Sequence, residues 1–138
     1  MPLEEEREDT FRRLCRQILN IDDTILGTSI IDKGGNIITS MSKPAFESRF
    51  NVPRDIKANS GTAAIMMLGM AKDMERAFGI TRSIASIHTG CILMLIPIAT
   101  TFEEEILVGL VLQPSVNTEY IIRRIQKSLK NNAPSAVE

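Results

Sequence analysis

The sequence has no tryptophan, one tyrosine, one histidine and two cysteines among its 138 residues. Aromatic residues make up only 4%, so the stacking platforms that single-strand nucleic-acid binders use are scarce. The net charge of −1 provides no overall basic field for a phosphate backbone. Two cysteines and one histidine cannot complete a four-ligand zinc site in one chain without carboxylates, and they form no disulfide framework. We therefore expect no nucleic-acid partner, no metal and no cofactor.

The chain also lacks a signal peptide and a long hydrophobic run. Its first nine residues contain five carboxylates and one arginine, and have neither a basic n-region nor an apolar h-region. The longest apolar stretches, residues 63–71 and 91–99, are about half of the roughly 20 residues that a membrane-spanning helix needs. We expect a soluble cytoplasmic protein without stable membrane insertion.

Motifs of the common enzyme classes are absent as well. The sequence contains no Walker loop, no dinucleotide-binding glycine fingerprint, no Gly-x-Ser-x-Gly elbow and no His-Glu-x-x-His motif. His88 and Cys91 could act as base and nucleophile, or two chains could pool them around zinc. We favour the alternative that Gly90 makes a turn between two strands and that Cys91 starts a buried strand. The sequence therefore predicts no catalytic residue and no metal ligand.

Two charged clusters have a simpler structural explanation than a binding site. The glutamates at residues 103–105 could hold a cation, but three consecutive carboxylates at a loop tip usually form a solvated turn that protects a strand end. The last predicted helix carries cations towards its C-terminal end, where the helix macrodipole favours them even without an anionic partner. These cations are Arg123, Arg124, Lys127 and Lys130.

What the chain does have is a hydrophobic fraction of 43%, enough to bury the core of one domain of this length. Helical spacing predicts a first helix over about residues 4–20, and runs rich in Ile and Thr at 24–31 and 36–41 predict a β-hairpin around the turn at 32–35. Residues 42–59 are expected to form a connection. A second helix is predicted from Ser60, as N-cap, to residue 78, where Gly79 stops it.

Three further strands are predicted at residues 81–89, 91–99 and 106–113, followed by a helix that starts at Asn117. The last two of these strands are apolar on both alternating faces, which is typical of a sheet covered on both sides by helices. The order is α-β-β-α-β-β-β-α in an α+β fold, with one domain over residues 1–130 and a flexible tail over 131–138.

The second helix is the most informative element. Residues placed at 100° steps gather Met67, Met70, Met74, Ala77 and Phe78 on one side, which we expect to face the sheet. The opposite side carries Lys72, Glu75 and Arg76 in its C-terminal half but is apolar in its N-terminal half. The apolar part is predicted to contact a partner and consists of Gly61, Ala64, Ile65 and Leu68. The alternative cover is the connection at 42–59, folded back over the helix.

The element order, the hairpin at 25–40 and the strand pair at 92–98 and 106–112 resemble the roadblock family of dynein-light-chain-type proteins. The resemblance spans about residues 11–129. It rests on Gly27 in the first strand, on the turn residues Asp32 and Gly35, and on a second helix rich in small and apolar residues.

The resemblance implies a five-stranded antiparallel sheet between helices, and dimers formed through the second helix and the third strand into one continuous sheet. With the third strand included, the expected interface residues are Gly61, Ala64, Ile65, Leu68, Lys72, Ile84 and Ser86. It also implies a non-catalytic regulator or scaffold of small Ras-like GTPases, as a homodimer or as a heterodimer with a paralogue. The alternative is a small-ligand sensor with an apolar pocket between the sheet and the second helix.

Overall fold

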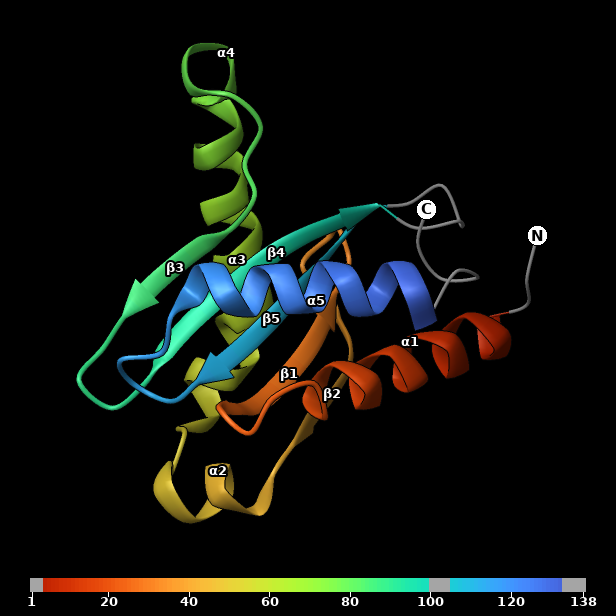
Figure 1. The fold of residues 1–138 in the computed structure, drawn as a ribbon, viewed down its shortest axis with the longest axis vertical. Helices are drawn as coiled ribbons and strands as arrows, with labels where there is room; N and C mark the ends of the chain where they lie inside the picture. Colours follow the sequence, from red (N-terminus) through yellow and green to blue (C-terminus); the bar gives the residue numbers. More distant parts are fainter. Residues whose placement is uncertain (1–3, 100–104, 133–138) are drawn as a thin grey trace.

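The computed structural model describes residues 4–99 and 105–132 as a five-stranded antiparallel sheet with helices on both faces (Figure 1). The strand order is β2-β1-β5-β4-β3, so β2 and β3 form the two edges. The predicted fold class is confirmed. In chain order the elements are α1 (Glu4–Leu19), β1 (Ile25–Ile31), β2 (Ile37–Ser42), α2 (Pro44–Arg49), α3 (Arg54–Asp73), α4 (Glu75–Phe78), β3 (Ile84–Ile87), β4 (Ile92–Ala99), β5 (Glu105–Leu112) and α5 (Thr118–Asn132).

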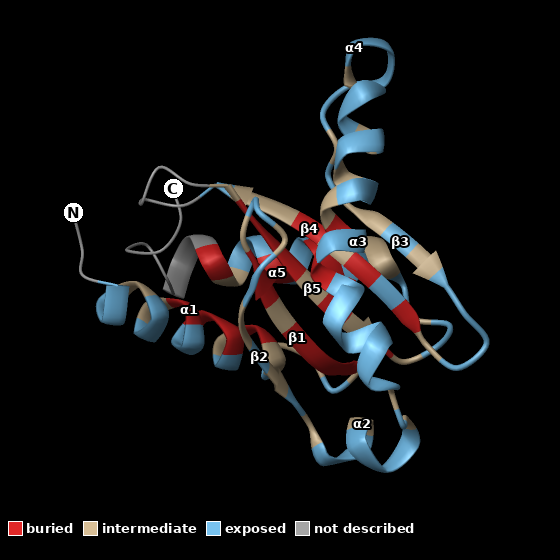
Figure 2. Cartoon of the chain, turned by 180° about the vertical axis from the view of Figure 1, so that it is seen from behind, coloured by how far each residue is buried: buried red, intermediate tan, exposed pale blue. Residues whose placement is uncertain are grey.

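The main core lies between the sheet and the pair of helices α1 and α5. Each helix buries one apolar stripe at the three- and four-residue spacing of a single helical face, Phe11 to Ile18 in α1 and Ile121 to Leu129 in α5. The two helices also contact each other, because the Gln17 side-chain amide donates to the Ser128 hydroxyl at 3.1 Å. Figure 2 shows this buried layer in red along the strands and the inner sides of the helices.

The β1–β2 hairpin forms where the sequence predicts it, because its turn satisfies its own backbone. The Asp32 carboxylate accepts hydrogen bonds from the amides of Gly34 and Asn36, both at 2.9 Å. Gly35 has a φ of 86°, which glycine adopts without steric cost. This closed turn reaches across to α3 on the other face of the sheet.

The second predicted helix starts earlier than expected. The boundary at Ser60 is wrong, since α3 begins at Arg54 directly after Pro53, and the supposed connection contains α2 as well. Residues 54–59 are all exposed, so they carry no apolar periodicity that could predict the helix. Gly79, at a φ of 96°, ends the helical segment as predicted, but the single helix expected up to residue 78 is interrupted at Met74, which separates α3 from α4.

The last helix also begins as predicted, because the Asn117 side chain accepts a hydrogen bond from the Tyr120 amide at 3.1 Å. Helix α5 continues to Asn132, so the first two residues of the predicted tail are helical, and the rest of that tail lies outside the described residues. Glu105 begins β5, whereas Glu103 and Glu104 are outside the described residues too. Across the described ranges, no helix is long and apolar enough to cross a bilayer.

Candidate partner interface

Helix α3 packs on the sheet through its small residues, so the predicted assignment of its two faces is wrong. Gly61 and Ala64 are buried, and Ala64 forms a cluster with Ile31 and Leu107. Ile65 and Leu68 are half-buried against this cluster, as is Leu95. A Cβ atom on Gly61 would overlap the Gly35 carbonyl oxygen of the hairpin turn. The helix can lie this close to the sheet only because its inner stripe is small. Gly61 and Ala64 are therefore covered by the chain itself.

The methionine side of α3 is exposed and is not packed on the sheet. The exposed fractions are 67% for Met66, 71% for Met70, 59% for Met74 and 83% for Phe78 at the end of α4. In Figures 1 and 2 the upper part of α3 and the whole of α4 extend beyond the sheet. We call this surface the methionine face; it consists of Met66, Met67, Met70, Met74 and Phe78. Contiguous exposed apolar side chains of this kind mark contact surfaces.

Strand β3 is an open edge. It pairs only with β4 among the described strands, and it is four residues long. Ile84 and Ser86 are half-buried on the α3 side of the sheet, opposite Leu95 and Leu93, and Leu93 is itself 42% exposed. An unpaired edge beside exposed apolar side chains is a template for strand pairing with another chain. That Ile84 and Ser86 lie in an interface stays a prediction.

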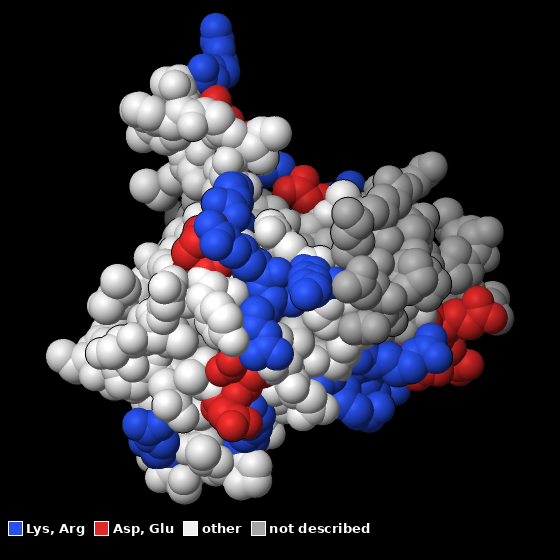
Figure 3. Space-filling model, viewed as in Figure 1, with Lys and Arg blue, Asp and Glu red and all other residues white. Residues whose placement is uncertain are grey.

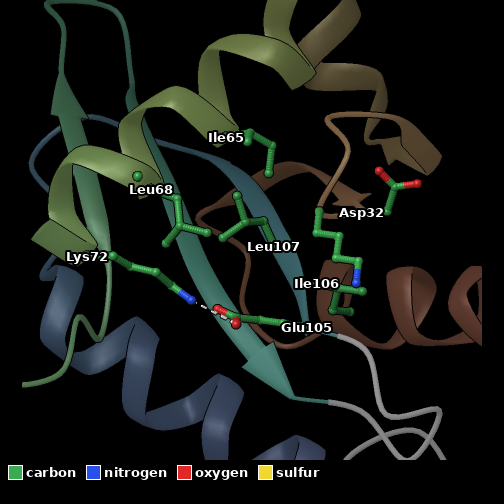
Figure 4. A pocket seen from close by; sticks show the side chains of 9 residues that line it. Asp32, Ile65, Leu68, Lys72, Glu105, Ile106 and Leu107 are labelled. Carbon is green, nitrogen blue, oxygen red and sulfur yellow. Dashed lines mark hydrogen bonds and ion pairs between the residues drawn. The ribbon is translucent and has the colours of Figure 1, made fainter.

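A shallow pocket of about 280 Å³ lies between α3, β5 and the hairpin turn (Figure 4). Its floor is apolar, with Ile65 and Leu68 facing Leu107, and its rim is charged. The Lys72 ammonium at the rim forms an ion pair with the Glu105 carboxylate at 2.9 Å. Lys72, Ile65 and Leu68, all expected at an interface, therefore line this pocket.

The surroundings of His88 and Cys91 favour a structural role. His88 hydrogen-bonds Ser86 through Nε2, at 2.7 Å from the hydroxyl oxygen, and its amide donates to the Cys91 carbonyl in the turn. Burial raises the pKa of Cys91 and outweighs the nearby Arg49 charge, so its thiolate is disfavoured. Within the described residues no three His, Cys, Asp or Glu side chains gather in a way that could hold a metal ion. The predicted absence of a metal stays a prediction.

Sequence reasoning missed the methionine face because it assigned the larger apolar residues to the core. Three charged residues, Lys72, Glu75 and Arg76, supported that choice, yet two of them contact other parts of the protein. Lys72 pairs with Glu105, and the Glu75 carboxylate accepts a hydrogen bond from the Thr81 amide at 2.8 Å. That hydrogen bond holds the pKa of Glu75 below its usual value. Two features of the sequence could have indicated the correct orientation. Gly61, Ala64 and Leu68 are spaced along one side of the helix and allow close packing on the sheet, and methionines are typical of adaptable surfaces.

A sheet with α1 and α5 on one face and α3 on the other defines a three-layer α+β domain. This is the fold of roadblock domains. No family model and no curated protein sequence matches the chain. Among solved structures it is similar to a roadblock/LC7 domain from Streptomyces avermitilis, with a TM-score of 0.60 and 9% identity over 86% of this chain and 92% of that one.

Two solved structures of MglB show the same fold. The MglB protein from Thermus thermophilus aligns with a TM-score of 0.61 and 12% identity, over 96% of this chain and 91% of that one. An MglB structure with a tetrameric arrangement aligns with a TM-score of 0.65 and 12% identity, over 96% of this chain and 90% of that one. At these identities the similarity establishes the architecture alone.

Proposed function

We propose that the chain is a homodimeric, non-catalytic regulator or scaffold in the cytoplasm that binds a small Ras-like GTPase or a related complex. The roadblock fold supports this role, since the sequence resemblance implies GTPase partners for that family. One observation carries the dimer: the methionine face and the open β3 edge lie next to each other and are both uncovered. A second copy of the chain supplies matching surfaces for both.

The proposed dimer has a two-fold axis perpendicular to the sheet. Two copies of β3 then pair antiparallel, which continues the sheet from one protomer into the next. The same axis keeps corresponding sheet faces on one side, so the two α3 helices approach each other and bury their methionine faces. Ile84 and Ser86 would lie beside the pairing strands. A heterodimer with a paralogue would use the same surfaces.

The test is a binding experiment with the GTPases of the source organism. The chain, immobilised through its C-terminus, is incubated with each GTPase in its GDP-bound, GTP-analogue-bound and nucleotide-free forms. Retention of one GTPase at micromolar concentration supports the proposal, and a nucleotide preference would separate regulation from tethering. If every GTPase fails to bind although light scattering gives a dimer, the GTPase assignment is wrong. A monomer at micromolar concentration would refute the dimer.

The pocket beside Lys72 favours a second candidate, a small-ligand sensor. It has an apolar floor and a charged rim, as many ligand sites do, and it lies between the sheet and the helix, as the sequence alternative expects. The methionines at 66–74, expected to line such a pocket, do not line it, and Ile65 and Leu68 do. Native mass spectrometry of freshly purified protein distinguishes the two functions. A sensor should retain a small molecule in a fraction of the chains, whereas a scaffold should give only the masses of monomer and dimer.

A further inference from the structure

The outer face of α5 is basic. Since the helix buries its isoleucines against the sheet, its cationic side chains up to Lys127 lie on its outer side, on the side of the molecule opposite α3. Arg123 is 75% exposed and Arg124 is 43% exposed at the side chain, and Lys127 is exposed as well. Figure 3 shows these cations as a blue band across the centre of this face.

Carboxylates neutralise this band only in part. Glu119 is shared by Arg82 and Arg123, at 3.0 and 3.6 Å, and Asp22 pairs with Arg124 at 3.0 Å. Among the described residues, Lys127 has no ion-pair partner. Three arginines thus share two carboxylates and the lysine has none, which leaves a local positive excess on a chain whose net charge is −1.

Two exposed side chains with apolar character lie on the same side of the sheet. Ile87 is 79% exposed and is paired with Ile92, whose side chain belongs to the core beneath α1 and α5. Since directly opposite residues share a face of the sheet, Ile87 points to the α5 side. Tyr120 is 48% exposed, and the Arg124 guanidinium donates a hydrogen bond to its hydroxyl at 3.0 Å.

The proposed dimer brings two copies of this surface together, and the inference rests on the proposed function in this respect. A two-fold axis perpendicular to the sheet leaves the α5 helices of both protomers on one side. Ile87 lies on the pairing strand and Tyr120 at the start of α5, so both lie nearer to the axis than the acidic first turn of α1 does (Figure 1). The dimer therefore presents the basic bands of both α5 helices on one side.

We propose that this surface docks peripherally on a bilayer that carries anionic headgroups. Arginines and a lysine around an exposed tyrosine and isoleucine match the composition of membrane-interface surfaces, where cations meet headgroups and apolar side chains enter the boundary region. The pocket with the apolar floor opens on the α3 side, away from this surface. Docking requires no inserted helix, and would hold a bound GTPase near the membrane.

The test is flotation of the full chain with vesicles of 30% phosphatidylglycerol in phosphatidylcholine, against vesicles of pure phosphatidylcholine. The protein should float only with the anionic vesicles and be released by 0.5 M salt. Each cation near an anionic surface raises partitioning about fivefold, so Arg123→Glu with Lys127→Glu should lower it at least about 25-fold. The matched control, Arg54→Glu with Lys57→Glu at the exposed start of α3, makes the same charge change and should float like the parent chain.

Each of the other possible outcomes would refute one part of the proposal. If the parent chain does not float, or if the α5 variant floats as well as the control, the docking surface is wrong. If soluble polyglutamate binds the chain while vesicles do not, the partner is an acidic polypeptide and the membrane proposal is wrong. Sedimentation of the same samples tests the dimer separately. If the parent chain is a monomer that floats and the α5 variant does not float, the dimer alone is refuted. If the parent chain is a dimer that does not float with the vesicles, docking alone is refuted.

Discussion

Replacing Met66 with Glu and Met70 with Lys should dissociate the dimer without unfolding the protomer. Met66 is 67% exposed and Met70 is 71% exposed, so each has about two-thirds of its surface left to bury against a partner. Full burial of such a side chain stabilises by about 1.5 to 3 kcal/mol, which gives about 1 to 2 kcal/mol for each methionine. A symmetric dimer contains both residues twice, and it loses about 4 to 8 kcal/mol.

That loss is large compared with the roughly 8 kcal/mol that holds a micromolar dimer together, so the dissociation constant should rise at least about a thousandfold. The new charges are four residues apart with Glu first, an arrangement that stabilises a helix by about 0.2 to 0.5 kcal/mol. Sedimentation equilibrium from 1 to 100 µM should therefore give a monomer, while circular dichroism should retain most of the helix content of the parent chain, with any loss confined to the end of α3 and to α4.

The matched control places the same two charges on the inner side of α3, as Ile65→Glu with Leu68→Lys. These side chains pack against Ile31, Leu95 and Leu107, so the charges would be forced into an apolar contact. We expect a loss of several kcal/mol in the free energy of unfolding and a Tm lower by about 10 °C or more. The reasoning fails if the methionine variant stays dimeric, or if the two variants lose stability alike.

Three further predictions concern single residues. Gly61→Ala should cost about 1 to 3 kcal/mol in urea unfolding, because the hairpin turn must move, whereas Gly69→Ala, with open space around it, should stabilise α3 by about 0.5 to 1 kcal/mol. Burial raises the pKa of Asp32, but its hydrogen bonds outweigh burial and leave the pKa below its usual value. The Asp32 carboxylate therefore stabilises the folded state fully above about pH 4, and this contribution is lost as the pH falls further. Asp32→Asn should lower the free energy of unfolding by about 1 kcal/mol at pH 7 and by little at pH 2. Burial raises the pKa of Cys15 to about 11, so iodoacetamide at pH 8 should alkylate Cys91 at least about tenfold faster, as followed by intact-mass spectrometry.

The parts of the fold that local chemistry determines could be predicted from the sequence. The hairpin follows from a turn in which Asp32 and Gly35 satisfy the backbone, and α5 follows from a single apolar stripe behind an Asn117 cap. Both depend on residues a few positions apart. The five-stranded sheet was accessible as well, because the strands at 92–98 and 106–112 are apolar on both faces.

The orientation of α3 could not be predicted by the same means, because both of its sides are apolar. The orientation is decided by the close approach of Gly61 to the backbone of the Gly35 turn. This contact joins residues 26 positions apart, so local sequence patterns do not indicate it. The start of the helix at 54–59 could not be predicted for a related reason. Its residues are exposed, so they show no apolar periodicity that would indicate a helix. The apolar residues expected at an interface therefore lie on the inner side of α3, and the interface itself stays a prediction.

The part of α3 that extends past the sheet, together with α4, has a consequence for how the protein responds to its own concentration. Helical segments this short are marginally stable in water unless tertiary contacts support them. In the proposed dimer most of that support comes from the second protomer, so the helical population of residues 69–78 and the degree of assembly are linked equilibria. Dilution would then unfold this segment locally before it affects the sheet, and amide hydrogen exchange there would measure the fraction of paired chains.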